Sequence, residues 1–315
     1  MGLKDIIDAA RKAPEPEPEW DFGEILWGYL ASLNDAEDET RAPGFHPSQL
    51  FEFCPRQEIL KHWFPKPGTK YFSPETFTRF DWGTAWHWFT QNHYFGPMGL
   101  LWGSWRCNHC GHHVKDSMMP PPHLECRSEG AKAHLEAVEA EIAAGTRPRR
   151  GGYWTYQEIG VRTAEGVVGH VDGILVMPWA ERVLLEVKTM AERWFKQLYA
   201  PDPRYVFQIS IYLWALGLDR CLLVYFSKDS DPKRPKTFWV ERDDGVIKEV
   251  KRRIALFNRS WPKKRLCQGN CVREDERAAE RCPWRLECFR EDIEEVIEKE
   301  RANRLREEEE ACNPD

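Results

Sequence analysis

Three residues near the middle of the chain combine acidic and basic groups at a spacing that suits metal-assisted chemistry. Glu186 and Lys188 lie two residues apart in LLEVKT, and Asp172 precedes them in GHVDG. Side chains alternate between the faces of a β-strand, so Glu186 and Lys188 would share one face. Two carboxylates in an apolar sheet repel each other, and a divalent cation relieves that repulsion. Such a cation supplies a water of lowered pKa and neutralises charge on a phosphate oxygen, while Lys188 stabilises developing negative charge.

A Glu–Lys pair is also compatible with a solvated strand face. The apolar neighbours Leu184, Leu185 and Val187 favour burial instead, and Asp172 comes one hairpin earlier. Glu158, in YQEIG, could face the same cleft or lie on the surface, and the pattern does not choose between these alternatives.

The elements that must position these residues follow from the spacing of apolar residues. Three short β-branched segments, 156–163, 167–177 and 183–189, are separated by turn residues and predict a three-stranded meander. A helix is expected at about 204–217, followed by one more apolar strand, CLLVYFS. Helical patterns also cover four other segments, at about 47–64, 74–95 and 131–144 and from 245 onward.

The order of several short motifs resembles a known family. GHVDG, LEVKT and QISIY, with GTAWH upstream, are similar to motifs of the RecB/AddB-like branch of the PD-(D/E)xK nuclease superfamily, which includes CRISPR-associated and phage exonucleases. The resemblance implies that His87, Asp172 and Glu186 bind Mg²⁺ or Mn²⁺ together with the backbone carbonyl of Val187. It implies that Lys188 is catalytic. It also implies that Gln208 and Tyr212, which lie one helical turn apart, position the site or the DNA. A histidine on a helix is by itself more often structural.

This resemblance implies an α/β fold with a restriction-endonuclease-like core, in which helices flank a mixed central sheet. A helical iron–sulfur region and a small zinc-ribbon-like insert would be added to that core. The expected organisation along the chain is a flexible arm (1–45), an N-terminal helical part of the nuclease domain (46–102), a zinc-binding insert (103–130), the catalytic core (131–244), an iron–sulfur segment (245–290) and a charged C-terminal helix or tail (291–315).

Ten cysteines are many for a protein expected in the cytoplasm, where disulfides are rare, and their clustering favours metal ligation. Nucleases of this branch carry an iron–sulfur cluster with one cysteine before the core and three after it. The resemblance therefore implies a [4Fe–4S] cluster on Cys54, Cys271, Cys282 and Cys288, with Cys267 as the alternative to Cys271. The family's usual CxxC pair is broken because position 279 is alanine. Zinc on the same thiolates, or free core cysteines, are the alternatives.

A second group of possible ligands comprises Cys107, Cys110, His123 and Cys126. The spacing CxxC, twelve residues, HxxC is typical of a structural zinc site with four protein ligands. His109, His112 and His113 compete for the nitrogen position, and a loop of free thiols is the alternative. Such a site would stabilise a short insert that cannot form its own core.

Net charge and hydropathy set the wider expectations. The formal net charge is −6, but residues 251–265 contain seven Lys or Arg and no acid, which suits either a phosphate backbone or a solvated helix face. The sequence contains neither a membrane-length apolar run nor an N-terminal secretion signal, so a cytoplasmic protein is expected.

The predicted function is DNA hydrolysis, with an exonuclease acting on single strands or ends in recombination and repair, phage DNA processing or CRISPR adaptation. No GxxxxGK[ST] motif is present, so any unwinding requires a helicase or another partner. The alternatives are a DNA-end-binding subunit that uses the fold as a clamp, and a metal-sensing or redox regulator.

Overall fold

A computed structural model describes Tyr29 and residues 43–66, 73–120, 154–228 and 234–312, with six isolated positions between 132 and 144. The chain divides into two units, residues 1–41 with 68–82 and residues 42–67 with 83–315. The described part of the first unit is Tyr29 and residues 73–82, which begin helix α5 (Pro74–Phe89). The predicted arm at 1–45 lies outside the described residues, apart from Tyr29 and 43–45. None of the described helices is both long enough and apolar enough to span a membrane.

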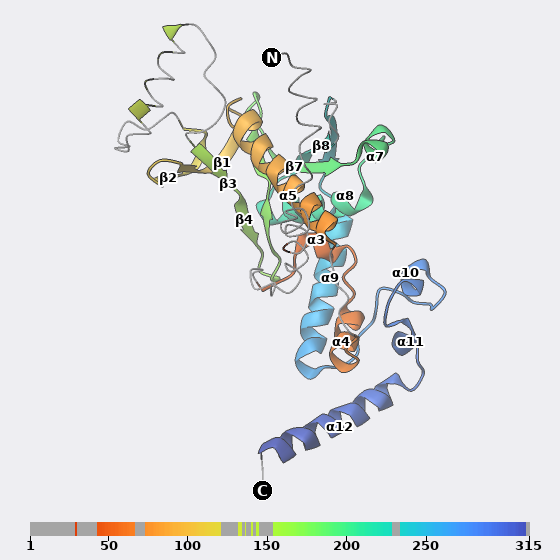
Figure 1. Ribbon diagram of the computed structural model, residues 1–315. Coiled ribbons are helices and arrows are strands. Elements are labelled where there is room, and N and C mark those ends of the chain that lie inside the picture. Colours follow the sequence, from red (N-terminus) through yellow and green to blue (C-terminus); the bar gives the residue numbers. More distant parts are fainter. Residues whose placement is uncertain are drawn as a thin grey trace, which may run out of the picture. The chain divides into compact units, whose positions relative to one another are not determined.

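A mixed seven-stranded sheet forms the centre of the second unit (Figure 1). The strand order is β2-β1-β6-β7-β8-β9, and β3 also pairs with β1. Strands β7 and β8 are parallel, and the other pairs are antiparallel. A separate two-stranded sheet contains β4 and β5. The strand bounds are β1 Leu101–Cys107, β2 His113–Met118, β3 Trp154–Gln157, β4 Ile159–Arg162, β5 Val168–Val171, β6 Gly173–Val176, β7 Arg182–Met190, β8 Arg220–Ser227 and β9 Lys236–Glu241.

The predicted meander is present, but two of its three strands are interrupted. The first segment breaks at Glu158 into β3 and β4, and the second breaks at Asp172 into β5 and β6. The halves before and after each break belong to different sheets. Both breaks therefore fall at acidic residues, where the chain passes between the seven-stranded and the two-stranded sheet.

The parallel pair β7–β8 requires a crossover connection, which α7 (Glu192–Lys196) and α8 (Pro203–Leu216) provide. Asp202 caps α8 by accepting a hydrogen bond from the Arg204 N–H at 2.8 Å, and Pro203 occupies the first helical turn. Gly217 ends the helix in the left-handed conformation, with φ of 67°. The predicted helix at 204–217 and the predicted strand at 221–227 are thus both confirmed.

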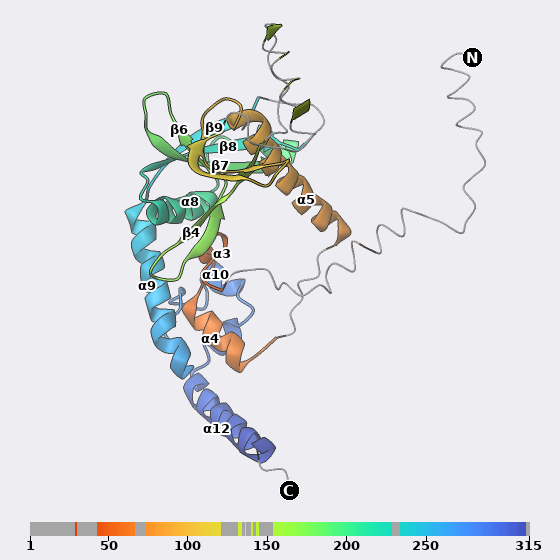
Figure 2. The ribbon, with the colours of Figure 1, turned by 90° about the vertical axis from the view of Figure 1, so that its left-hand side faces the viewer.

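Apolar side chains cover both faces of the sheet. On one face, Trp105, Trp154 and Leu185 belong to a buried cluster of residues from β1, β3, β6, β7 and β8. On the other face, Leu184 and Leu223 pack with Ile209 and Leu213 of α8. Figure 2 shows α8 along one face of the sheet. Since alternate residues of β7 enter different clusters, the face that carries Leu184, Glu186 and Lys188 is the one that α8 covers.

Helices α3 (Pro47–Leu50) and α9 (Asp244–Ser260) pack against α8, and α4 (Pro55–Trp63) packs against α9. Helix α12 (Ile293–Cys312) follows at the C-terminal end of the chain. Helices α4 and α9 lie side by side (Figures 1 and 2). Ile59 and Leu60 of α4 are fully buried against Trp284, Ile293 and other residues of the C-terminal segment.

The predicted insert at 103–130 is described only in part, and its described residues lie in the central sheet. Residues 103–118 contribute β1 and β2 to the central sheet, and β1 pairs with β6, β3 and β2. Trp105 is fully buried there, which explains why this segment cannot stand apart from the core. Residues 121–130 lie outside the described part of the chain.

Candidate active site

Three carboxylates lie in register across neighbouring strand segments. Ile159 pairs with Val171, and Gly173 pairs with Leu185. Continued by one residue, these registers place Glu158 opposite Asp172 and Asp172 opposite Glu186. The side chains of directly opposed residues point to the same face. The two strand breaks therefore bring together Glu158, whose position the sequence did not decide, and Asp172 and Glu186, which the sequence predicted to form the site.

His87 reaches this row from the last turn of α5. Its Nδ1 lies 3.0 Å from Oδ1 of Asp172. The other carboxylate oxygen, Oδ2, accepts a hydrogen bond from the backbone N–H of Val187 at 2.7 Å. Both oxygens of a carboxylate that is only 8% exposed thus have partners, which fixes its orientation. The predicted metal contact of the Val187 carbonyl stays a prediction.

The ligand atoms of His87, Glu158 and Asp172 lie within 4.8 Å of one another. In the part of the chain that the structure describes, this is the only group of three or more His, Cys, Asp or Glu side chains so close together. One imidazole and two carboxylates form a donor set that suits Mn²⁺ or another divalent cation. The predicted set contained Glu186 in place of Glu158.

Glu186 has a different partner in this arrangement. Its Oε1 lies 2.5 Å from Nζ of Lys188, and the side chain is 2% exposed. The ammonium group also lies 4.8 Å from the centre of the Tyr205 ring, on α8. The alternation that predicted a shared face for Glu186 and Lys188 is confirmed.

The charges of these groups are strongly interdependent. Burial raises the pKa of Glu186 to about 7 against the opposing effect of Lys188. Burial and the charge of Asp172 also raise the pKa of Glu158, although its side chain reaches the surface. Burial would raise the pKa of Asp172 as well, but the hydrogen bond and charge of His87 hold it below its ordinary value. The site resists full ionisation of its three acids and therefore favours an added positive charge.

Gln91 is a polar residue of the acidic site that was not predicted from the sequence. Its Nε2 donates to the backbone carbonyl of Asp172 at 2.8 Å and lies 3.5 Å from Oε1 of Glu158. The residue is buried in the π-helical turn Thr90–Phe95, which continues α5. Because Gln91 follows His87 by four residues, helical spacing was the signal that pointed to it.

Gln208 and Tyr212 lie on α8 as predicted, with Nε2 of Gln208 3.5 Å from the Tyr212 hydroxyl. Tyr212 is 6% exposed, and burial followed by the charge of Glu186 raises the pKa of its hydroxyl. The pair thus lies beside the acidic site, and its predicted positioning role stays a prediction.

Four of the predicted cluster cysteines line one small cavity of about 80 Å³. They are Cys54, Cys271, Cys282 and Cys288. Cys267 is not part of this lining, although its thiol is close enough to Cys54 for the charge of Cys54 to raise its pKa, after the larger effect of burial. Arg56 connects the segments by donating to the carbonyl oxygens of Cys267 at 3.2 Å and Cys288 at 3.0 Å.

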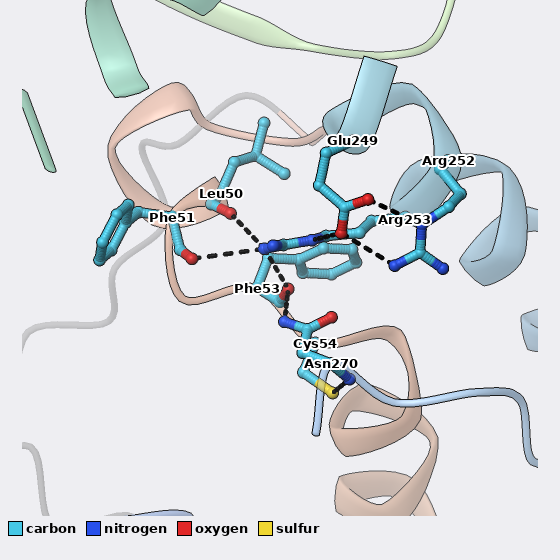
Figure 3. Close-up of polar contacts among 8 residues, drawn as sticks. All are labelled: Leu50, Phe51, Phe53, Cys54, Glu249, Arg252, Arg253 and Asn270. Carbon is cyan, nitrogen blue, oxygen red and sulfur yellow. Dashed lines mark hydrogen bonds and ion pairs between the residues drawn. The ribbon is translucent and has the colours of Figure 1, made fainter. Parts of the chain in front are cut away.

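Hydrogen bonds to Cys54 and to the residues that precede it hold Cys54 in place (Figure 3). The Asn270 side chain donates to the Phe53 carbonyl at 2.8 Å, and the Asn270 backbone N–H donates to Sγ of Cys54 at 3.4 Å. Arg253 on α9 approaches the carbonyls of Leu50 and Phe53 at 3.4 and 3.3 Å.

Which metal centre these four cysteines would hold stays a prediction, and sulfur spacing is the property that distinguishes the two candidates. Sulfur ligands of a single zinc ion lie ~3.8 Å apart, as follows from the Zn–S bond length and tetrahedral geometry. No three of the described cysteines lie within 4.8 Å of one another. The thiolates of a [4Fe–4S] cluster bind different iron atoms and therefore need a wider spacing.

The predicted zinc ligands are only partly described. Cys107 is 1% exposed and belongs to the apolar cluster on one face of the sheet, whereas Cys110 is exposed at the β1–β2 turn. His123 and Cys126 lie outside the described residues. The zinc site therefore stays a prediction.

Comparisons with known proteins give weak structural likenesses. No family profile matches the chain, and no curated protein matches it. Among solved structures, the protein SSO0001 is 13% identical with a TM-score of 0.34, over 74% of this chain and 85% of that chain.

Two exonuclease structures are also similar. LHK-Exo, the alkaline exonuclease from Laribacter hongkongensis, in its complex with dAMP is 14% identical with a TM-score of 0.29, over 76% and 93% of the chains. A phage related exonuclease from Haemophilus somnus 129PT is 12% identical with a TM-score of 0.25, over 43% and 70%. Because every TM-score lies below 0.5, these likenesses assign no activity, and the chemistry must be judged from the residues of this chain.

Proposed function

We propose that this protein is a metal-dependent nuclease that hydrolyses phosphodiester bonds in DNA. The observation that carries the proposal is the row of Glu158 and Asp172 at the strand breaks and Glu186 on β7, with His87 and Lys188 beside it. A purely structural role would not explain why a sheet buries two acids and leaves a third next to them.

His87, Glu158 and Asp172 would hold Mg²⁺ or Mn²⁺, and Glu186, which the strand register places opposite Asp172, would join them if its contact with Lys188 opens. When bound, such an ion supplies a water of lowered pKa and neutralises charge on a phosphate oxygen.

The residues of the chain contribute orientation and charge. The Val187 N–H and His87 fix both oxygens of Asp172. Lys188 keeps its proton because Glu186 and Asp172 raise the pKa of its ammonium group more than burial lowers it. This ammonium group, held between Glu186 and the Tyr205 ring, can stabilise negative charge on a phosphate during hydrolysis.

The finer proposal is an exonuclease that acts on single-stranded DNA or DNA ends. Recombination and repair, phage DNA processing and CRISPR adaptation are all compatible settings. A separate helicase or recombination partner would supply unwinding, since the sequence contains no nucleotide-binding GxxxxGK[ST] motif.

The decisive experiment is digestion of DNA labelled at either end, with Mn²⁺, by the wild type and by Glu186→Ala and Lys188→Ala. We expect both variants to lose at least a hundredfold in rate. Lys188→Ala removes the positive charge that stabilises the transition state, and Glu186→Ala removes the carboxylate that holds this ammonium group in place. Circular DNA tests for internal cleavage, and the two labels give the polarity.

The matched control is Glu165→Ala, which removes a surface acid paired with Lys251 at 3.3 Å. This variant should cleave like the wild type. Equal cleavage by Glu186→Ala and the wild type would reject the nuclease proposal. Binding of labelled ends without any cleavage by the wild type would favour the end-binding clamp.

Two further metal centres belong to the proposal. A [4Fe–4S] cluster on Cys54, Cys271, Cys282 and Cys288 would join the first helices to the C-terminal segment. Zinc on Cys107, Cys110, His123 and Cys126 would stabilise the segment after β2. Neither centre has an open position in its proposed ligand set, so both would act on structure and not on hydrolysis.

A further inference from the structure

A pocket of about 390 Å³ opens beside the acidic site, and Glu158 is one of its lining residues. The pocket is large enough for a ligand of nucleotide size. Its walls include the apolar side chains of Ile174, Leu216 and Leu218 together with Trp102 and Arg182. Glu158 therefore connects the pocket directly to the group of candidate metal ligands.

The sheet register places this pocket on the catalytic face. Trp102 pairs with Ile174, and Arg182 pairs with Val176, two residues further along β6. The side chains of Trp102 and Arg182 thus share the face that carries Asp172 and Glu186. Ile174 follows Asp172 by two residues, which corresponds to ~7 Å along a strand.

Arg182 and Trp102 form a cation–π pair inside this pocket. The guanidinium carbon lies 4.3 Å from the centre of the Trp102 ring. Arg182 is exposed, and no carboxylate within the described ranges forms an ion pair with it. Arg220, which lies over Trp239 at 4.6 Å, instead has Glu181 as an ion-pair partner. The N–H groups at the edge of the Arg182 guanidinium are therefore available to an anion from outside the described chain.

Charge distribution gives the pocket two different ends. Glu158 and Asp116 are negative and would repel a phosphate, whereas Arg182 attracts one. The strand register, continued by one residue, places Glu158 opposite Asp172 and pairs Arg182 with Val176, so Trp102 and Ile174 lie between Glu158 and Arg182. Leu216 and Leu218, at the end of α8, add to this apolar wall. A ligand with a flat, largely apolar group attached to a phosphate would place the phosphate at Arg182 and the flat group against the apolar wall. A nucleotide has that chemistry.

We infer that this pocket is a nucleotide subsite, in which Arg182 binds a phosphate that flanks the cleaved phosphodiester and the apolar wall at Trp102 holds the adjoining base. The inference rests on the proposed nuclease function, because Glu158 belongs to both sites. Base contact through an apolar wall does not depend on the identity of the base, so the subsite accepts any sequence.

The first test measures binding without cleavage. A fluorescein-labelled ten-nucleotide thymidine strand is titrated in EDTA with full-length Glu186→Ala protein, alone and combined with Arg182→Ala, Arg182→Lys or Trp102→Ala. Fluorescence anisotropy should show about tenfold weaker binding for Arg182→Ala and for Trp102→Ala. Arg182→Lys should recover part of the loss, because it keeps the charge. The slope of log Kd against the logarithm of the salt concentration should decrease by ~0.7 for Arg182→Ala, which corresponds to the loss of one phosphate contact with a single strand.

The matched control is Trp239→Ala, which removes an exposed tryptophan that also lies beneath an arginine but is outside the pocket. It should bind the strand like its parent. In proteins with intact Glu186, Arg182→Ala should raise KM about tenfold and change kcat less than twofold, because a flanking phosphate is bound equally in the ground and transition states.

The outcomes separate the subsite from the nuclease activity. Wild-type cleavage with unchanged binding and salt dependence in Arg182→Ala and Trp102→Ala would overturn the subsite alone. Binding that depends on Arg182, without cleavage by the wild type, would support the subsite and reject the nuclease. A wild type that neither binds nor cleaves the strand would overturn both.

Discussion

At the scale of single residues, the geometry of the site depends on the few hydrogen-bond and ion-pair partners that its acidic side chains have. Asp172 is fixed by His87 and by the N–H of Val187, while Glu186 is paired with Lys188. Glu158 has one long contact, 3.5 Å from Gln91, and its pKa is raised by burial and by Asp172. A bound cation would therefore give the Glu158 carboxylate a counter-charge beside its long contact with Gln91.

We predict that Glu158→Gln weakens Mn²⁺ binding by at least tenfold, because the amide lacks the negative charge that stabilises a bound cation. Isothermal titration calorimetry with the metal-free protein measures this directly. Glu165→Gln, on the β4–β5 turn, is the control and should bind Mn²⁺ like the wild type. An unchanged affinity in Glu158→Gln would remove this residue from the metal site.

At the scale of elements, helix α9 holds the loop that carries Cys54. Glu249 pairs with Arg253 at 2.7 Å and with Arg252 at 2.8 Å, and Arg253 in turn contacts the carbonyls that precede Cys54 (Figure 3). The hydrogen bond from Arg252 is the largest influence on the carboxyl group and lowers the pKa of Glu249 to about 2. One carboxylate thus supports both the helix and the position of the loop.

We predict that Glu249→Gln lowers the free energy of unfolding by about 0.5–1 kcal/mol at pH 7, the range for a partly exposed ion pair. Because the pKa of Glu249 is lower in the folded state, its contribution is complete above about pH 4.5 and decreases as the pH falls toward 2. Urea unfolding at pH 7 and pH 3 should therefore show a smaller difference between the variant and the wild type at pH 3.

The matched control for this element is Glu298→Gln, which breaks an exposed ion pair with Arg301 on α12. It should change the unfolding free energy little at either pH. A difference between Glu249→Gln and the wild type that grows in acid would contradict the assigned direction of the pKa shift.

At the scale of the whole molecule, residues more than 200 positions apart meet around the cysteine cavity. Arg56 binds the carbonyls of Cys267 and Cys288, and α4 packs on the C-terminal segment through a buried apolar cluster. The acidic site lies elsewhere, on the sheet. The residues around the cysteine cavity therefore connect the first helices of the second unit to its C-terminal segment. They are not part of the acidic site.

We predict that Cys288→Ser removes most of the bound iron and visible absorbance and exposes residues 265–292 to trypsin, while the central sheet stays protected. The apolar contacts of α4 limit the damage, because most of them are made by side chains other than Cys288. Limited proteolysis with mass spectrometry and iron analysis measure both effects. Cys312→Ser, outside both predicted ligand sets, is the control. Retained iron with an unchanged cleavage pattern would exclude Cys288 as a ligand.

Local patterns were sufficient to predict much of this site. The alternation in LLEVKT predicted that Glu186 and Lys188 share a face, and the spacing around α8 predicted its position with Gln208 and Tyr212 on one side. These features depend on periodicities of two and 3.6 residues, which are encoded within a few neighbouring positions.

Only the tertiary structure decided which distant residues meet. Glu158 joins Asp172 because two strands break at their acids, and such breaks have no periodic signal. Gln91 lies one helical turn after His87, but that spacing does not specify its hydrogen bond to the distant Asp172 carbonyl. In the same way, residues 103–118 became part of the central sheet through pairing with β6 and β3. Such contacts depend on sheet register across long sequence separations, which the types and spacing of neighbouring residues do not specify.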